Sequence, residues 1–345
     1  MVLAGIVAFL AAPVAITPAD PRVHLVGRFD RRDPKAVRSS WPGTGVELRV
    51  QGSELEFTAE DTGQNYYQIE QNGKPTQVIK LSTGPNTVKI PIADPKKPTL
   101  LRILKRTEAF IGAVTFTGFK LASGKFLRAE PPKRRLEVIG DSITCGYGNE
   151  GKSQNEKFNA ATENAYMSYA SIAARQVGAE VTLNAWSGRK MYPDNTLPSI
   201  YDLTNPLDAT SVFDFKAPAP DAVVINLATN DFGAGNPEET AWVGAYEAFI
   251  AQLRKHYPKA AIYPAIGSMM SDAYPPNVKA LSTLRGYLTR MVARLNAKGD
   301  ANVRLVEFEG QKFEDGIGSD FHPNIVTHQK MAEVLVKALR RDLKW

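Results

Sequence analysis

The stretch that decides the fold runs from residue 136 to residue 144 and reads Leu136-Glu137-Val138-Ile139-Gly140-Asp141-Ser142-Ile143-Thr144. A short, mostly apolar run that ends in glycine and polar residues is typical of a buried strand of a parallel sheet. Such a strand delivers the side chain that follows it to the carboxyl edge of the sheet, where reactive serines are displayed. Ser142 is therefore a candidate nucleophile, although a Gly-Asp-Ser turn is also an ordinary way to end a strand.

Two polar segments downstream strengthen this interpretation. Residues 226–231 (Asn-Leu-Ala-Thr-Asn-Asp) end a second apolar run, and residues 320–324 (Asp-Phe-His-Pro-Asn) precede the last helical segment. Together with Ser142 they supply a hydroxyl, a carboxamide, an imidazole and a carboxylate, the groups that serine acyl transfer requires. Helix initiation explains the proline and final asparagine of the second segment. It does not explain the whole combination, so we favour catalysis.

Of the four histidines, His322 has the most suitable position for a general base. His24 falls in the early β-rich region, His256 closes a helix before a proline, and His328 is expected at a solvated position of the final helix. His322 lies on an irregular segment between a strand and a helix, where catalytic groups are commonly displayed. Asp320 lies two residues earlier, and in an extended backbone both side chains project to the same side. Asp320 is therefore predicted to hold the imidazole by its other nitrogen.

The extended motif Gly140–Glu150 and the two downstream segments resemble those of the SGNH (GDSL-type) hydrolases. Within these the chain is most similar to carbohydrate esterase family two, the bidomain acetyl-xylan and sugar acetylesterases, and the resemblance covers nearly the whole chain. One departure is visible. The motif that contains Asn230-Asp231 usually reads Gly-x-Asn-Asp, and here Ala228 stands at the glycine position. The added methyl group is expected to reshape the strand end without removing Asn230.

The resemblance implies a role for each site residue. Ser142 would be the nucleophile, His322 the base and Asp320 the acid. The oxyanion hole would consist of Ser142, the Gly188 amide and the Asn230 side chain. No metal and no organic cofactor is required for this chemistry.

Aromatic residues next to the motifs are candidates for substrate binding. They are Tyr147, Trp186, Phe232 and Phe321. Aromatic rings form apolar walls against sugar faces, and core packing is the alternative role for each of them.

The pattern of elements predicts two domains after a leader. Residues 20–130 contain short alternating segments and the hairpin signal Asn72-Gly73, which predict an all-β sandwich. The family resemblance makes this sandwich jelly-roll-like. In residues 131–345 apolar strands alternate with helices, which predicts an α/β catalytic domain with a parallel sheet covered on both faces. Its strand ends carry the candidate site residues.

Residues 1–19 are predicted to be a signal peptide, so the protein is expected to be secreted or periplasmic. The apolar run Val2–Ile16 has the length of a signal-peptide core and is too short for an integral membrane span. A basic start is missing, and a packed N-terminal segment is the alternative.

Composition limits the partners. The formal net charge is +6, but the basic residues are dispersed, so nucleic acid is not a predicted partner. Cys145 is the single cysteine, which excludes an intramolecular disulfide and offers no metal-ligand spacing. The oligomeric state does not follow from the sequence.

The leading hypothesis is a serine esterase that removes O-acetyl groups from polysaccharide or oligosaccharide hydroxyls through an acetyl-enzyme. Acetylated xylan and glucomannan are the substrates that the resemblance implies. An SGNH lipase or lysophospholipase is the alternative enzyme. A carbohydrate-binding protein whose hydrolase site has lapsed is the alternative from another class. A metal-dependent phosphoesterase that uses Asp231, Asp320 and His322 is disfavoured because Ser142 would have no task.

Overall fold

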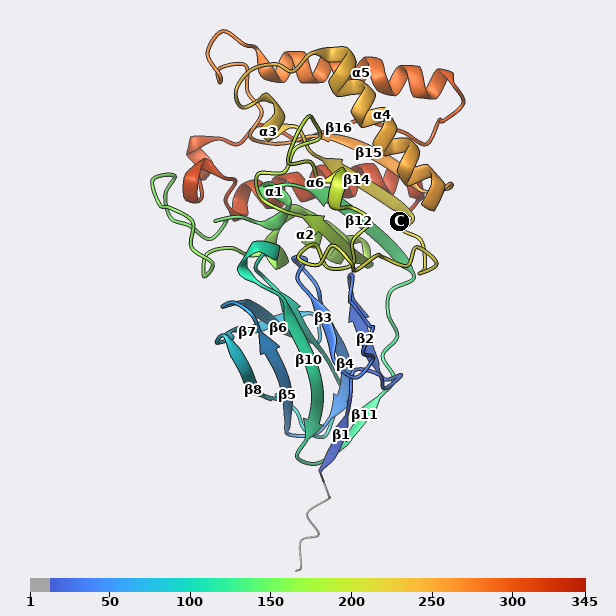
Figure 1. The fold of residues 1–345 in the computed structure, drawn as a ribbon. Coiled ribbons are helices and arrows are strands. Elements are labelled where there is room, and N and C mark those ends of the chain that lie inside the picture. Colours follow the sequence, from blue (N-terminus) through green and yellow to red (C-terminus); the bar gives the residue numbers. More distant parts are fainter. Residues whose placement is uncertain (1–12) are drawn as a thin grey trace, which may run out of the picture.

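A computed structural model describes residues 13–345 of the chain. An all-β part is followed along the chain by a part in which strands and helices alternate (Figure 1). The two parts stack end to end and are joined by residues 128–133, which form no helix or strand. The fold class predicted from the sequence is confirmed.

The N-terminal part is a sandwich of two sheets. One sheet has the order β1-β10-β5-β8, with β3 also paired to β10, and the other has the order β11-β4-β9-β6-β7, with β2 paired to β4. Its strands are β1 Val14–Ile16, β2 Val23–Val26, β3 Val37–Ser39, β4 Gly45–Gln51, β5 Glu54–Asp61, β6 Tyr66–Gln71, β7 Lys74–Lys80, β8 Gly84–Pro91, β9 Thr99–Lys105, β10 Val114–Leu121 and β11 Lys125–Leu127.

The alternation of the sequence explains how the sandwich closes. In β5 every second side chain is buried, including Leu55 and Phe57, and these pack in one core with Phe116 of β10. Asn72 and Gly73 form the β6–β7 turn with φ of 51° and 79°, so the hairpin prediction is confirmed.

The end of the predicted leader needs correction. Residues 1–12 lie outside the described part of the chain. Val14–Ile16, which the sequence assigned to the leader, form β1 and pair antiparallel with Phe119–Leu121 of β10. Because this pairing adds a strand to the sandwich, the folded unit begins before residue 20.

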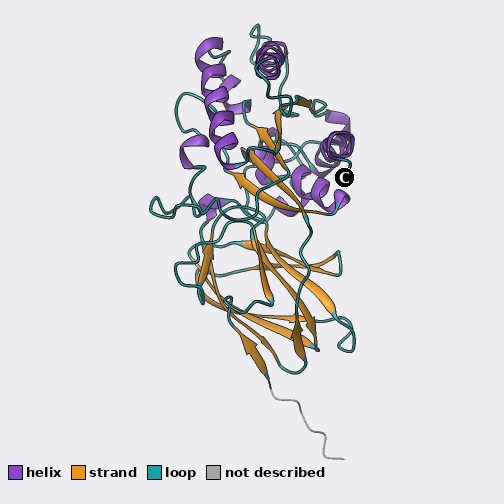
Figure 2. Ribbon diagram, turned by 90° about the vertical axis from the view of Figure 1, so that its right-hand side faces the viewer, coloured by secondary structure: helices purple, strands orange, loops and turns teal. Residues whose placement is uncertain are grey.

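The C-terminal part is a five-stranded parallel sheet with the order β13-β12-β14-β15-β16. Helices cover both of its faces, as the view in Figure 2 shows. The strands are β12 Arg134–Gly140, β13 Ala179–Ala185, β14 Ala222–Asn226, β15 Ala261–Ile266 and β16 Val306–Glu307. The helices are α1 Ser142–Cys145, α2 Tyr169–Val177, α3 Thr229–Phe232, α4 Glu239–His256, α5 Ala280–Ala297 and α6 Ile325–Leu343.

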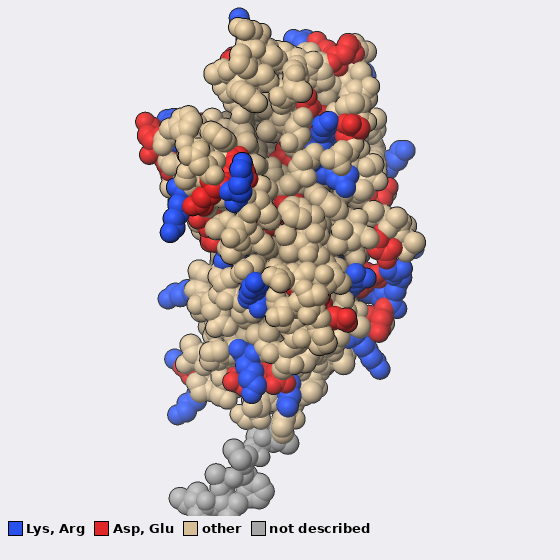
Figure 3. All heavy atoms as spheres, turned by 60° about the vertical axis from the view of Figure 1, so that its left-hand side comes forward, with Lys and Arg blue, Asp and Glu red and all other residues tan. Residues whose placement is uncertain are grey.

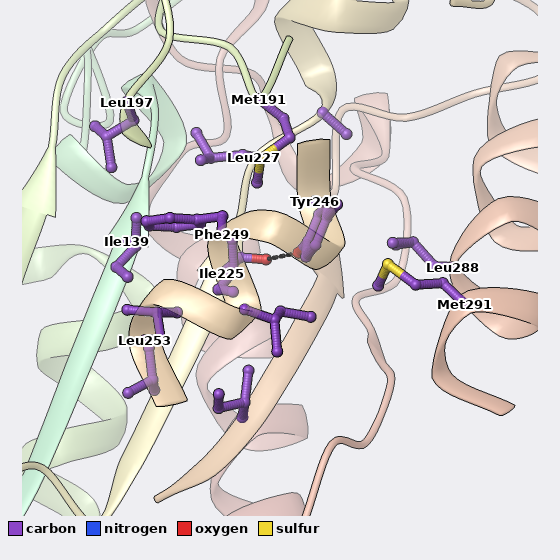
Figure 4. Packing of buried hydrophobic residues seen from close by; sticks show 14 of the residues in the cluster. Ile139, Met191, Leu197, Ile225, Leu227, Tyr246, Phe249, Leu253, Leu288 and Met291 are labelled. Atoms are coloured by element: carbon purple, nitrogen blue, oxygen red, sulfur yellow. Dashed lines mark hydrogen bonds between the residues drawn. The ribbon is translucent and has the colours of Figure 1, made fainter. Parts of the chain in front are cut away.

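Two buried clusters fix the helices on the sheet. Residues of α4 and α5 pack on one face, and residues of α2 and α6 pack on the other. Figure 4 shows Tyr246 and Phe249 of α4 over β14, where the Tyr246 hydroxyl donates to the Ile225 carbonyl at 3.1 Å. Buried on both faces, β14 consists of the apolar run Ala222–Ile225 followed by Asn226, so the next residues emerge at the carboxyl edge.

The sandwich contributes side chains to the interior of the sheet domain. Trp41 has no exposed surface and belongs to the same buried cluster as Ile139 of β12 and Trp242 of α4. Arg28 forms a buried ion pair with Glu137 of β12 at 2.9 Å. The two parts therefore share a packed and partly charged interface.

Charged side chains are scattered over the surface. On the face in Figure 3, lysines and arginines alternate with acidic residues, with no single basic patch. Among the helices of residues 13–345, none combines the length and the apolar character needed to cross a membrane.

Candidate active site

Ser142 stands at the carboxyl end of β12, as predicted. It is the first residue of α1, and the Asp141 carboxylate caps this helix by accepting the Ile143 amide hydrogen at 3.0 Å. Gly140 is required by a close approach, because a Cβ there would lie 2.0 Å from Thr144 Oγ1. Burial raises the pKa of Asp141 to about 7. Through its bond with the Ile143 amide, Asp141 braces the turn that presents the serine.

His322 meets Ser142 directly. Its Nε2 lies 2.8 Å from Ser142 Oγ, although 180 residues separate the two along the chain. The imidazole is partly buried, and this burial lowers the pKa of His322 below its ordinary value of 6.5. A neutral imidazole with Nδ1 protonated accepts the serine hydroxyl hydrogen through Nε2, which is the arrangement that a general base needs.

The predicted role of the Asp320 carboxylate is wrong for this structure. The Nδ1 hydrogen of His322 goes to the backbone carbonyl of Asp320 at 3.0 Å, not to its side chain. The extended backbone assumed from the sequence is absent, since Asp320 and Phe321 have φ of 48° and 62°. The carboxylate accepts bonds from the Tyr147 hydroxyl, the Lys157 ammonium group and the Phe158 amide, all at 2.9–3.0 Å.

Neighbouring loops hold this left-handed segment in place. The Ser319 amide donates to the Gly148 carbonyl at 3.0 Å, and the Asp320 amide donates to the Glu156 carbonyl at 2.9 Å. Gly148 has φ of 54°, and a Cβ there would lie 2.5 Å from Ser319 Cβ. Two consecutive left-handed residues other than glycine cost about 1–3 kcal/mol each. These surrounding contacts offset that cost, and the result is a fixed imidazole.

Gly188 and Asn230 lie on the loop and strand end that flank Ser142. Gly188 has φ of 76°, and a Cβ there would meet nothing within 4 Å, so the residue borders open space. Asn230 Nδ2 donates to the Arg189 carbonyl at 3.0 Å and makes a longer contact of 3.4 Å with Asp141. The Asn230 amide thus ties the strand end after β14 to both neighbouring loops. The distances alone leave the oxyanion roles of Gly188 and Asn230 as predictions.

Three of the four predicted aromatic residues lie near this site or at its surface. Tyr147 packs on the His322 ring with centroids 4.2 Å apart, and Phe321 is 53% exposed. Trp186 is partly buried and holds the Arg189 guanidinium over its ring at 4.7 Å. Phe232 is the exception, because it is 1% exposed and packs edge-on against a core tryptophan. The prediction that Phe232 binds substrate is therefore wrong.

An aromatic row beside the imidazole was not predicted from the sequence. Phe158 packs on Tyr147 with centroids 4.7 Å apart, and Phe110 of the sandwich packs on Phe158 at 5.3 Å. Phe110 is 44% exposed. Phe158 stands among polar residues in the sequence, and this was the available signal. Its neighbour Phe110 lies 48 positions away in the sequence.

The structure places Asp231 and His328 in hydrogen-bonded positions. Asp231 accepts hydrogen bonds from the Met191 and Tyr192 amides and from Trp242 Nε1, so it braces a turn. His328 has no exposed surface and accepts the Tyr169 amide hydrogen through Nδ1. The expected solvated position of His328 is wrong, because α6 turns this face onto α2.

Comparisons with known proteins agree with this geometry. Residues 138–330 match the GDSL-like Lipase/Acylhydrolase family, and residues 25–131 match the family Carbohydrate esterase 2 N-terminal. A solved family two carbohydrate esterase from Clostridium thermocellum is 38% identical with a TM-score of 0.89, and the match covers 94% of this chain and 99% of that one. The chain belongs to the family two carbohydrate esterases.

Two further relatives extend the comparison. "Cellulase/esterase CelE" of Acetivibrio thermocellus is 38% identical over 94% of this chain, which spans 40% of the length of that protein. "Acetylxylan esterase / glucomannan deacetylase" of Cellvibrio japonicus is 27% identical, and the match covers 96% of this chain and 91% of that protein. The bidomain arrangement is thus common to this chain and its solved family two relative.

Proposed function

We propose that this family two member is a serine esterase that removes O-acetyl groups from polysaccharide or oligosaccharide hydroxyls. The observation that carries the proposal is the 2.8 Å contact between Ser142 Oγ and His322 Nε2 at the strand end of a family two fold. Acetylated xylan and glucomannan are the proposed substrates, since the Cellvibrio japonicus relative is an acetylxylan esterase and glucomannan deacetylase.

The proposed reaction has two steps. Ser142 Oγ attacks the acetyl carbonyl carbon while its proton passes to His322 Nε2, and the tetrahedral oxyanion is stabilised by the Ser142 and Gly188 amides and the Asn230 side chain. His322 then gives the proton to the leaving sugar oxygen, which leaves an acetyl-enzyme. Water attacks this ester with His322 again as base, and acetate and free Ser142 result.

During this reaction a backbone carbonyl would hold His322 in its orientation. The Asp320 carbonyl accepts the Nδ1 hydrogen and fixes the tautomer whose Nε2 is free to accept a proton. We propose that the Asp320 carboxylate acts one step further away, by anchoring Tyr147 and residues 157–158 around the imidazole.

Acetate release from acetylated xylan, glucomannan and cello-oligosaccharides tests the proposal, with Ser142→Ala as the matched control. The wild-type protein is expected to release acetate, and the alanine variant is expected to fold and release none. Equal release by both proteins would contradict the mechanism. Faster hydrolysis of long-chain than of acetyl 4-nitrophenyl esters would favour the lipase alternative.

Glycan binding without turnover is a second candidate function. The Clostridium thermocellum relative is described in complex with cellohexaose, and Phe321 of this chain is an exposed aromatic residue directly before His322. Calorimetric titration of the wild-type protein and of the Ser142→Ala variant with cellohexaose tests this function. A lapsed site predicts binding by the wild-type protein together with no acetate release from any substrate above.

We further propose the division of labour and the location of the protein. Residues 131–345 would carry the reaction, and the sandwich before them would support it. The apolar N-terminal run supports secretion or a periplasmic location. Expression of the full chain with fractionation of the culture tests the location, and recovery of the protein only inside cells would contradict it.

A further inference from the structure

The loop that carries Gly188 is held by a carboxylate from the sandwich. Glu108 follows β9, and one of its carboxylate oxygens accepts the Ser187 amide hydrogen at 2.7 Å. Its other oxygen accepts the hydrogen of the Ser187 hydroxyl. Glu108 has no exposed surface and Ser187 is partly buried, so both bonds form at the interface between the two parts of the chain. A hydrogen bond in such a buried place is strengthened by the low local dielectric constant.

Glu108 is itself rigidly placed. Its amide donates to the Glu163 carboxylate at 3.0 Å, and its carbonyl accepts from Lys105 Nζ at 2.9 Å. Glu163 and Lys105 are fully buried. Burial beside Glu108 raises the pKa of Glu163 well above its ordinary value, while burial lowers the pKa of Lys105 to about 8. Burial raises the pKa of Glu108 as well, and the bonds from Ser187 and the charge of Lys105 offset part of this rise.

Other hydrogen bonds also hold the loop that carries Gly188. The Trp186 amide donates to the Gly140 carbonyl at 3.3 Å, and Asn195 Nδ2 donates to the Gly188 carbonyl at 3.1 Å. Within residues 13–345 no protein acceptor pairs with the Gly188 amide itself. The Ser187 amide and the Gly188 amide belong to adjacent planar peptide groups, separated only by the φ and ψ of Ser187, so holding Ser187 by its amide and its side chain restricts the direction of the Gly188 N–H bond.

We propose that Glu108 is a positioning residue for the oxyanion hole, holding Ser187 so that the Gly188 amide points at the reacting carbonyl oxygen. This inference rests on the proposed esterase function. The sandwich would then complete the active site without contacting the reacting atoms. A misdirected donor stabilises the transition state less well, so losses of this contact are expected in kcat more than in KM.

Steady-state hydrolysis of 4-nitrophenyl acetate by the full chain tests the proposal. Glu108→Ala is expected to lower kcat about 10-fold or more, below the range of about 10²–10³ for loss of a whole oxyanion donor, with KM little changed. Glu108→Gln is expected to recover part of the loss, since its carbonyl still accepts the Ser187 amide hydrogen. Tyr166→Phe is the control, because it removes another buried bond between the two parts, from the Tyr166 hydroxyl to Glu70 at 2.8 Å.

A second measurement keeps the test decisive if Glu108→Ala does not fold. Glu108→Gln, Ser187→Ala and the double variant form a cycle, and the combined loss in kcat is expected to be smaller than the product of the single losses. Additive losses, an unchanged kcat in folded Glu108→Ala, or an equal loss in Tyr166→Phe would overturn the proposal. An active wild-type protein with any of these results rejects this inference alone. A wild-type protein that hydrolyses no ester rejects the esterase function as well.

Discussion

The two segments that bring Ser142 and His322 together are built in opposite ways. Residues 140–145 form a short strand-to-helix turn with its own cap, and nearly all of its geometry is set by neighbours in sequence. Residues 318–322 have two left-handed residues that are held by Gly148, Glu156 and Lys157. The first segment is locally determined, whereas the second depends on tertiary contacts. Variants of the two segments are therefore expected to fail differently.

The largest effect is expected at the imidazole itself. His322→Ala removes the group that takes the serine proton, so kcat for 4-nitrophenyl acetate is expected to fall on the order of 10⁴-fold or more. His256→Ala is the control, since this residue lies at the end of α4 away from Ser142. Comparable activity of the two variants would show that the contact with Ser142 has no chemical role.

Loss of the Asn230 amide is expected to have the next largest effect. Asn230→Ala removes a proposed oxyanion donor and the tie to the Arg189 carbonyl, so kcat is expected to fall about 10²–10³-fold. Asn236→Ala removes a comparable amide at a helix-linking loop and should leave kcat unchanged. An unchanged KM for Asn230→Ala would support a role in the transition state, and a loss confined to KM would contradict it.

Asp320→Ala tests residues 318–322, the segment that depends on tertiary contacts. The variant keeps the backbone carbonyl that holds His322 and loses three anchors of the carboxylate, so a loss of about 10-fold in kcat is expected. Lys157→Met removes one exposed partner and should cost less. If Asp320→Ala were as damaging as His322→Ala, the carboxylate would have a direct role that the observed contacts do not provide.

The smallest effect is expected in the pH profile. His322 must be neutral to act as a base, and its pKa is lowered by burial, so kcat/KM should fall only as the pH drops through a value below 6.5. Asp320→Asn removes a nearby negative charge that favours the imidazolium form, and should move this acid limb slightly further down. An acid limb above 6.5 in the wild-type protein would contradict the buried environment of the imidazole.

Regular elements could be predicted from the sequence because their causes are local. The Asn72-Gly73 turn and the capping of α6 by Asn324, which accepts the Thr327 amide hydrogen at 3.0 Å, follow from residues within a few positions. Ser142 and His322 were found in the same way, as polar residues at the ends of apolar runs.

Orientations set by distant contacts could not be predicted. The direction of the Asp320 carboxylate depends on Tyr147 and Lys157, more than 160 residues upstream. Phe232 follows Asn230 by two positions, yet the short turn of α3 directs it into the core against Trp242. Glu108 reaches Ser187 from another domain, and no periodicity of either segment encodes that meeting.

Trp41 of the sandwich contributes to the stability of the parallel-sheet part. Its indole is fully enclosed among side chains of the parallel-sheet part, and enclosing a tryptophan of this size is worth about 5 kcal/mol. Excising the first 130 residues would leave a hole the size of an indole in the remaining interior. The C-terminal part is therefore expected to be less stable on its own, and the two parts are expected to melt in a single transition.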